Sequence, residues 1–174
     1  QDCTGLILPG VGDFDSCRNM LVNSSFYSDF IVIVQKQKIP ILGICIGMHL
    51  LAVSSEEGIE RGLSLVEGKV IKFRDLPINS LVLPHMGWNS VSIAEGNPLF
   101  RNVDTRKGFY FIHNYHYSDC ENSTIATSYH GYNFPVAVQK GVIFGVQFHP
   151  EKSHKNGHIL FENFVNFVQE NVAS

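Results

Sequence analysis

The stretch PILGICIGMHLL, from Pro40 to Leu51, decides the fold of this chain. The apolar run after Pro40 predicts a buried parallel strand, and the apolar residues after Cys45 predict a helix packed against it. Gly43 and Gly47 flank Cys45 at two positions on each side and permit a sharp strand-to-helix turn. The positive end of the helix dipole would favour the thiolate there. Cys45 is therefore either a nucleophile or a cysteine buried in a close-packed turn.

A second stretch, GVQFHPEKS at residues 145–153, supplies the groups that a nucleophile needs. An apolar strand ends at His149, Pro150 turns the chain, and Glu151 follows. A cysteine nucleophile requires a base, and the base requires a third group that holds its tautomer. A histidine at a strand end is more often a packed residue, but the adjacent carboxylate and the separate turn cysteine favour catalysis. We therefore predict a triad of Cys45, His149 and Glu151.

These two stretches resemble the class I, or triad, glutamine amidotransferases. Four more segments are similar to the glutaminase subunits of imidazole glycerol phosphate synthase and their close relatives: LILPGVGDF at 6–14, SSEEG at 54–58, PHMGWNSV at 84–91 and FYFIHNYHY at 109–117. The segments keep the family's order over nearly the whole chain. The resemblance implies an α/β fold of flavodoxin-like type, in which an open, mostly parallel sheet is flanked by helices and carries an added antiparallel β-segment.

The glycine-rich turn at residues 9–12 follows the first expected strand. It lacks the third glycine of a dinucleotide-binding fingerprint, because Asp15 stands at that position. By resemblance, backbone N–H groups stabilise the oxyanion formed on the nucleophile. The residues that this implies are Gly10, Val11, Gly12 and Ile46. A tight turn without a catalytic part is the alternative.

The resemblance also implies a glutamine-binding set. Its members are Gly47, His49 and the backbone of His113, Asn114 and Tyr115. Two of them depart from the family pattern, since His49 replaces the glutamine of C-x-G-x-Q and Asn114 replaces a serine. An imidazole can donate or accept one hydrogen bond at this place but cannot offer the N–H donor and C=O acceptor of an amide side by side. Glutamine affinity and its pH dependence are therefore expected to differ from the family pattern.

The segment PHMGWN contains the only tryptophan and is expected to be a loop. Tryptophan and methionine are typical interface anchors, although Trp88 fits a core position equally well. The resemblance assigns Met86, Trp88 and Asn89 to a partner-facing surface and makes Lys152 a candidate interface charge. The partner implied is a (β/α)8 cyclase subunit that receives ammonia. An ATP-dependent sugar amidotransferase of surface-polysaccharide synthesis stays open, because the two departures and EKSHKNG at 151–157 also fit that group.

Composition is that of one globular domain of 174 residues, with 44% hydrophobic and 17% charged residues. A net charge of −3 gives no electrostatic footprint for nucleic acid or an anionic membrane. The four cysteines form no CxxC pair, which favours a reducing cytoplasm, and no apolar run reaches the roughly 18 residues of a membrane span. His154 and His158 lie four apart without further ligands nearby, so neither a metal nor another cofactor is expected.

The family has one more βα unit ahead of Leu6. We therefore expect residues 1–174 to be a single amidotransferase domain that lacks this first unit. Along the chain, helices are expected over Phe14–Leu21 with Asp13 as cap, over Tyr27–Lys38 and from about Asn156. Strands are expected at Lys69–Phe73, Leu81–Leu83, Trp88–Ile93, Phe109–Tyr117, Ile125–Tyr129, Phe134–Gln139 and Val142–Phe148. The carboxylates of the loop Ser54–Gly62 are expected to form a solvated face.

The predicted activity is hydrolysis of the glutamine side-chain amide to glutamate and ammonia through a cysteinyl thioester. The ammonia would serve imidazole glycerol phosphate formation in histidine biosynthesis or, alternatively, amination of a nucleotide-linked sugar. Two other classes stay open. A cysteine peptidase could use the same Cys–His pair, and a non-catalytic regulatory subunit could keep the fold after losing glutamine binding at His49.

Overall fold

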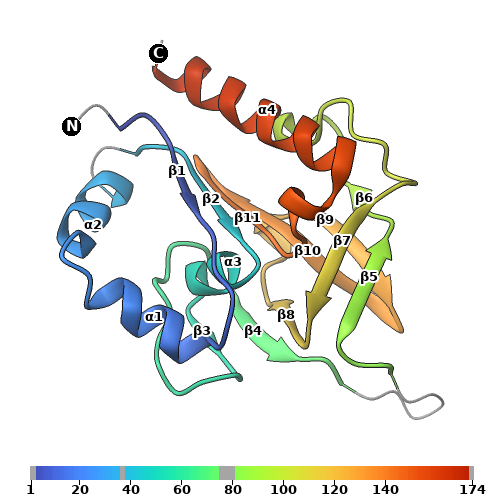
Figure 1. The fold of residues 1–174 in the computed structure, drawn as a ribbon, viewed down its shortest axis with the longest axis horizontal. Helices are drawn as coiled ribbons and strands as arrows, with labels where there is room; N and C mark the ends of the chain where they lie inside the picture. Colours follow the sequence, from blue (N-terminus) through green and yellow to red (C-terminus); the bar gives the residue numbers. More distant parts are fainter. Residues whose placement is uncertain (1–2, 36–37, 75–80, 173–174) are drawn as a thin grey trace.

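A six-stranded sheet forms the centre of the computed structural model, which describes residues 3–35, 38–74 and 81–172 (Figure 1). Its strand order is β1-β2-β11-β10-β9-β6. Three strands are parallel neighbours: β1 (Leu6–Leu8), β2 (Ile41–Ile44) and β11 (Ile143–Val146). Three continue the sheet in antiparallel fashion: β10 (Tyr132–Lys140), β9 (Thr124–His130) and β6 (Ser92–Ile93). The α/β prediction is confirmed, with the antiparallel meander as the added segment.

The helices and the sheet enclose two apolar clusters, one on each face of the sheet, and β2 contributes side chains to both. Ile41 belongs to a cluster with three helices: α1 (Phe14–Val22), α2 (Tyr27–Gln35) and α3 (Ile46–Leu51). Leu42 and Ile44 belong to the other cluster, which α4 (His154–Val172) closes with Leu160 and Phe164. Successive side chains of a strand point to opposite faces, so the continuous apolar run of β2 serves both clusters. Helices α1 and α2 (blue) lie together beside β1, whereas α4 (red) extends along the top of the view (Figure 1).

The helices largely follow the predictions. Asp13 caps α1 by accepting a hydrogen bond from the Ser16 N–H at 2.9 Å. Only Phe14 and Leu21 of this short helix are buried, and Met20 is 76% exposed. The segment from Tyr27 is a helix as predicted, although residues 36 and 37 lie outside the described part of the chain.

Two smaller sheets correct the strand predictions. One contains β3 (Ser54–Ser55), β4 (Lys69–Lys72) and β8 (Tyr115–Ser118), and the other pairs β5 (His85–Asn89) with β7 (Phe109–His113). The expected loop PHMGWN is therefore a strand, and the expected single strand Phe109–Tyr117 is two strands that bend apart at Asn114. The segment 81–83 is not a strand. Of the strands expected at 69–73, 81–83 and 88–93, only the end of the last joins the main sheet, as β6.

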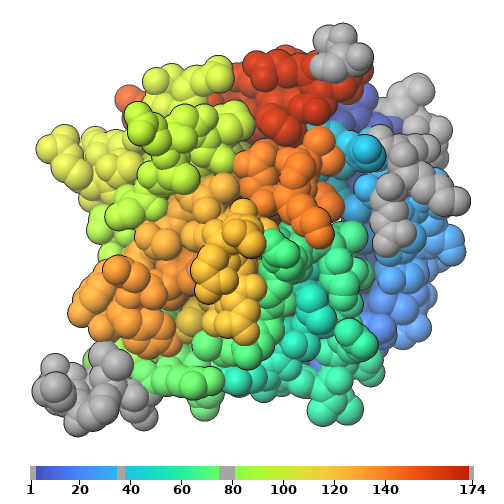
Figure 2. Space-filling view, turned by 180° about the vertical axis from the view of Figure 1, so that it is seen from behind, coloured from blue at the N-terminus to red at the C-terminus, as the bar shows by residue number. Residues whose placement is uncertain are grey.

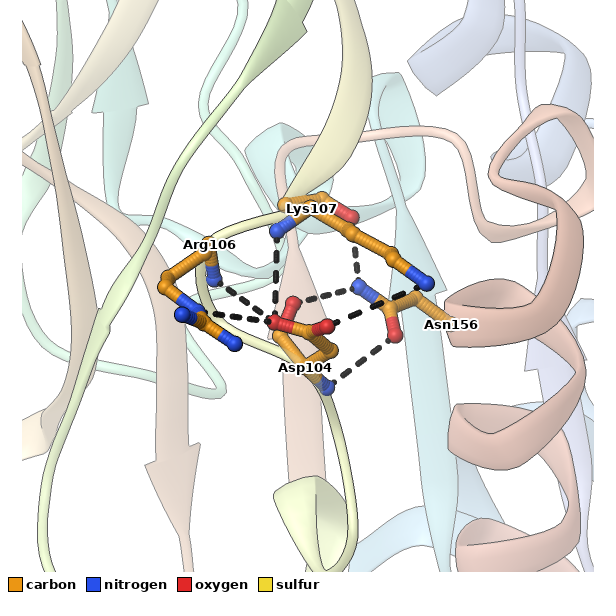
Figure 3. Close-up of polar contacts among 5 residues, drawn as sticks. Asp104, Arg106, Lys107 and Asn156 are labelled. Atoms are coloured by element: carbon orange, nitrogen blue, oxygen red, sulfur yellow. Dashed lines mark hydrogen bonds and ion pairs between the residues drawn. The ribbon is translucent and has the colours of Figure 1, made fainter.

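Asn156 fixes the loop before β7 onto the start of α4. Its Nδ2 donates to the carbonyl oxygens of Asp104 at 2.8 Å and Gly108 at 2.7 Å, and its Oδ1 accepts from the Asp104 N–H at 3.1 Å. The Asp104 carboxylate faces Arg106 and Lys107 on the same loop (Figure 3). The loop that leads into β7 is thus tied to the helix that follows η3 (Pro150–Lys152).

The remaining short helices are η1 (Pro98–Phe100) and η2 (Glu121–Ser123). Seen from behind, the meander of β9, β10 and β11 (orange) occupies the middle of the surface, with α4 (red) at one end (Figure 2). Within the described residues, no helix combines the length and apolar character needed to cross a membrane.

Candidate active site

Cys45 stands on a sharp turn between β2 and α3. Its backbone has φ 53° and ψ −110°, a conformation that costs a non-glycine residue about 1–3 kcal/mol. The surrounding backbone holds it in place, because the Cys45 N–H donates to Val146 O at 2.8 Å and its carbonyl accepts from the His49 N–H at 3.1 Å. The predicted turn is therefore present, and its strain is confined to the residue with the thiol.

The two glycines around Cys45 are required by close backbone contacts. A Cβ on Gly43 would lie 2.7 Å from the Gly47 carbonyl oxygen, and a Cβ on Gly47 would collide with the Leu8 carbonyl of β1. Because backbone atoms cannot move aside as side chains can, neither position accepts a larger residue without displacing the turn.

His149 and Glu151 form a pair at the end of the meander. The imidazole is 3% exposed, and its Nδ1 lies 2.6 Å from Glu151 Oε1. A carboxylate only accepts, so Nδ1 carries the hydrogen and Nε2 is left as the basic nitrogen. Two backbone contacts fix the residue: the His149 N–H donates to Tyr110 O at 2.9 Å, and the Ser153 hydroxyl donates to His149 O at 2.6 Å.

One cavity of about 300 Å³ brings Cys45 and His149 together. Its volume is at the lower end of small-molecule sites, about 300–1,000 Å³. Other predicted site residues also line it: Val11, Gly12, Ile46, His49, His113, Asn114, Tyr115 and Lys152. Gly10 and Gly47 do not, since Gly10 packs on Ile46 and Gly47 packs on β1. A larger cavity of about 670 Å³ beside β4 and β8 contains neither Cys45 nor His149.

Burial keeps the Cys45 thiol protonated in this state. It raises the pKa to about 11, and the charges of Glu151 and Glu57 add to the shift, whereas the Ile46 N–H and Lys152 oppose it. The sequence led us to expect that the helix dipole would favour a thiolate. That prediction is wrong, because the loss of hydration at a cysteine that is only 7% exposed outweighs the N–H groups of a helix of 6 residues.

His49 lines the cavity and bonds to Gln147, a residue that the sequence reasoning did not single out. Its Nε2 lies 2.7 Å from Gln147 Oε1, so Nε2 donates and Nδ1 is a bare acceptor. That Nδ1 and Gln147 Nε2 are buried and find no partner in the described part of the chain. Burial lowers the His49 pKa to about 4, only partly offset by the Gln147 bond, and the ring is neutral near pH 7.

Glu57 is a cavity residue that the sequence reasoning missed. It was grouped with the solvated carboxylates, but it is half-buried and lines the cavity with Cys45. Its Oε2 is buried without a hydrogen-bond partner among residues that the structure describes. Burial and the charge of Asp13 raise its pKa. Asp15 fixes the loop, since its carboxylate accepts from the Ile59 and Glu60 N–H groups at 3.0 and 3.1 Å.

The glycine turn forms the opposite edge of the cavity. Val11 is 81% exposed, and its carbonyl accepts a hydrogen bond from the Cys17 thiol at 3.4 Å. Gly12 has φ 117°, which only glycine adopts readily. On the other side, the Ile46 N–H is directed at the Cys45 sulfur and lowers its pKa. The turn and the start of α3 therefore line the same cavity as the thiol.

The residues predicted to face a partner differ in their exposure and position. Met86 and Trp88 are 61% and 48% exposed on the outer face of β5, and Trp88 stacks on His154 at a ring distance of 5.3 Å. Asn89 instead turns inward, where its Nδ2 bonds to His85 Nε2 and Tyr129 O. Lys152 lies at the cavity mouth with Nζ 5.7 Å from the centre of the Tyr110 ring.

No group of three or more His, Cys, Asp or Glu side chains in the described ranges is arranged to hold a metal ion. His154 packs on Trp88, and His158 Nε2 lies 3.2 Å from Glu162 Oε1.

Comparisons with known proteins agree on one family. The profile of glutamine amidotransferase class-I matches residues 2–167. The imidazole glycerol phosphate synthase subunit HisH of Leptospira interrogans is 47% identical over 94% of this chain and 81% of its own length. The subunit of that name from Methanocaldococcus jannaschii is 42% identical over 95% of this chain and 82% of its own. PurLQS from Thermotoga maritima shares the fold, with a TM-score of 0.66 at 19% identity over 97% of this chain and 81% of that one.

Proposed function

The chain belongs to the glutamine amidotransferase class-I family, and we infer that it hydrolyses glutamine and supplies the ammonia for imidazole glycerol phosphate formation in histidine biosynthesis. The observation that carries the chemistry is one cavity with a turn cysteine on one side and a histidine, oriented by a carboxylate, on the other. The names of the relatives favour the histidine pathway over sugar amination.

In the proposed mechanism, His149 acts first as a base. A thiol with a pKa of about 11 is protonated near neutral pH, so its proton must pass to His149 Nε2 as the sulfur attacks. The sulfur adds to the carboxamide carbon of glutamine and forms a tetrahedral oxyanion. The imidazolium then protonates the amide nitrogen of the substrate and the C–N bond breaks. Ammonia departs, and a γ-glutamyl thioester remains on Cys45.

The second half of the reaction uses the same groups in reverse. His149 Nε2 takes a proton from water, the hydroxide adds to the thioester carbon, and the C–S bond breaks. The sulfur regains the proton from His149, and glutamate is released. Glu151 keeps Nδ1 protonated and stabilises the imidazolium in both steps. We assign stabilisation of the oxyanion to the N–H of Ile46 and to those of Val11 and Gly12, because these residues line the same cavity as Cys45.

Glu57 provides a counter-charge for the substrate. Glutamine is a zwitterion, and its α-ammonium group can satisfy the buried Oε2 of Glu57 that has no partner in the described structure. His49 adds a neutral acceptor on the same cavity wall. The site therefore selects an amino acid with a free ammonium group, which a peptide interior lacks. This argues for a glutaminase over a peptidase.

The partner that we propose is a (β/α)8 cyclase subunit. Ammonia released into water would be protonated and diluted, so the cavity must open into the protein that consumes it. Met86 and Trp88 present exposed apolar surface on β5, and Lys152 adds a positive charge at the cavity mouth. We place the interface over these three residues.

The decisive test measures glutamate release and imidazole glycerol phosphate formation by the chain combined with a cyclase subunit. The protein should use glutamine as nitrogen source, and 6-diazo-5-oxo-norleucine should label Cys45. The Cys45→Ala variant should lose glutamate release, while synthesis from added ammonia continues on the cyclase subunit. Glutamate release by Cys45→Ala would show that the nucleophile is wrong. Glutamine hydrolysis without imidazole glycerol phosphate would overturn the pathway.

A further inference from the structure

A row of hydrogen-bonded side chains leads from the outer strand β5 to the wall of the glutamine cavity. His85 and His113 are direct partners in the β5–β7 register, and His85 Nδ1 lies 2.8 Å from His113 Nε2. His113 Nδ1 lies 2.8 Å from Tyr115 O, and Asn89 Nδ2 lies 3.0 Å from His85 Nε2 and 2.9 Å from Tyr129 O. The rings are 5% and 6% exposed.

Only one arrangement of hydrogens fits this row. A carbonyl oxygen accepts, so His113 Nδ1 carries the hydrogen that bonds to Tyr115 O. A neutral His113 then offers the Nε2 lone pair, and His85 must donate from Nδ1. His85 Nε2 accepts in turn, from the amide of Asn89. Burial lowers the pKa of both histidines, to about 4 for His85, which keeps the row uncharged near neutral pH.

The row ends at a bend that forms one wall of the cavity. Residues Ile112, His113, Asn114 and Tyr115 all line it, and Asn114 is the point where β7 ends and β8 begins. The bond from His113 Nδ1 to Tyr115 O spans this bend. A second bond, from the Phe73 N–H to Asn114 O at 3.1 Å, holds the middle of the bend from the residue that follows β4. The shape of the wall therefore depends on the tautomer of one histidine.

We propose that His113 is a positioning residue for glutamine binding, whose Nδ1–H fixes the bend at residues 112–115 and whose tautomer is fixed by His85 and Asn89. This inference rests on the proposed glutaminase function, because it concerns the wall of the same cavity. The imidazole is not a catalytic residue, since both of its nitrogens are occupied by protein groups. Its effect reaches the substrate through the backbone of Asn114 and Tyr115.

His116 provides a matched control. It is also a buried ring, 3% exposed, its Nδ1 lies 2.7 Å from a backbone carbonyl, that of Tyr117, and it packs on Phe73 as His113 does. Its Nε2 bonds to the Tyr132 hydroxyl at 2.8 Å, and it lines the cavity beside β4 and β8 instead of the one with Cys45. A purely structural role for buried histidines would make the two residues equivalent.

The experiment compares three variants of the full-length protein, measured with its partner subunit for KM and kcat. His113→Asn keeps an amide donor bonded to Cγ, where Nδ1 was, whereas His113→Gln moves the same amide one bond further out. We expect His113→Gln to raise KM for glutamine about tenfold, with kcat changed by less than about threefold. His113→Asn should stay within about threefold of the unaltered KM, and His116→Gln within about twofold.

Imidazole ¹⁵N spectra of the unaltered protein test the same inference without activity. His113 and His85 should both show the Nδ1–H tautomer, and this readout decides the matter if a variant fails to fold. Equal KM values for His113→Asn and His113→Gln, an equal effect of His116→Gln, or an Nε2–H tautomer at His113 would overturn the proposal. A protein that does not hydrolyse glutamine at all would overturn the proposed function but leave the tautomer result intact.

Discussion

His49 should make the stability of this protein fall as the solution becomes acidic. Its pKa is about 4 in the folded chain against an ordinary 6.5, mainly because the ring is buried. As pH falls below 6.5, His49 binds a proton in the unfolded chain but stays neutral in the folded chain. The stability contribution is therefore complete above pH 6.5, is lost between pH 6.5 and about 4, and does not change further below that.

The size of the effect follows from the two pKa values. At about pH 5.0, the unfolded histidine is almost fully charged and the folded one is almost fully neutral, so the free energy of unfolding falls by about 2 kcal/mol relative to about pH 7.5. The Gln147 bond is kept in the neutral state at both values. Other buried histidines add to the loss in the unaltered protein, so the contribution of His49 must be obtained as a difference.

Urea denaturation of the unaltered protein and of His49→Gln at these two pH values isolates that difference. The variant removes the titrating ring and should lose about 2 kcal/mol less on acidification. His158→Gln, a change at a ring on the exposed side of α4, serves as control and should lose as much as the unaltered protein. If His49→Gln loses as much stability on acidification as the unaltered protein, His49 is not held neutral by burial and the reasoning fails.

Three further predictions concern the triad and the fold. Glu151→Gln should lower kcat for glutamine hydrolysis by about a hundredfold or more with little change in KM, since the amide cannot stabilise the imidazolium; a wild-type kcat would remove Glu151 from the mechanism. The rate at which iodoacetamide alkylates Cys45, followed by peptide mass spectrometry, should rise about tenfold per pH unit up to about pH 10, because the pKa of the thiol is raised. A rate that stops rising below about pH 8 would contradict the raised pKa. Asn156→Ala should lower the free energy of unfolding, measured in urea, by about 2–4 kcal/mol, because three hydrogen bonds are lost. The control Asn171→Ala, at the exposed end of α4, should change it by less than about 0.5 kcal/mol. Equal effects of the two variants would show that the loop contact is not stabilising.

Local patterns predicted the elements around the cysteine well. The apolar run at β2, the glycines at 43 and 47 and the capping Asp13 are short-range signals, because each depends on neighbours within a few residues. The strand β5 was missed because it depends on pairing with residues far away in the sequence. The segment PHMGWN was expected to be a loop, and Gly87 does have φ 117°, yet pairing of His85–Asn89 with β7 makes it a strand. Long-range pairing overrides local preference in sheets.

The site shows the same division. Cys45, His149 and Glu151 stand out as candidates in the sequence because their chemistry and local context are unusual for purely structural residues. Glu57 could not be separated from Glu56 and Glu60, since all three stand in one polar loop. Only the fold of that loop onto Asp15 places one carboxylate in the cavity and leaves its neighbours outside.

What the sequence determined by itself is the set of candidate reacting groups and the strand–turn–helix that carries the thiol, because each is recognised from residues within a short segment. The tertiary structure alone decided the protonation states. Burial holds the thiol protonated and keeps His49 neutral, and hydrogen bonds select the tautomers of His85 and His113. The reason is physical: the free energy of a charge depends on hydration and on hydrogen-bond partners, and both are set by segments far apart in sequence.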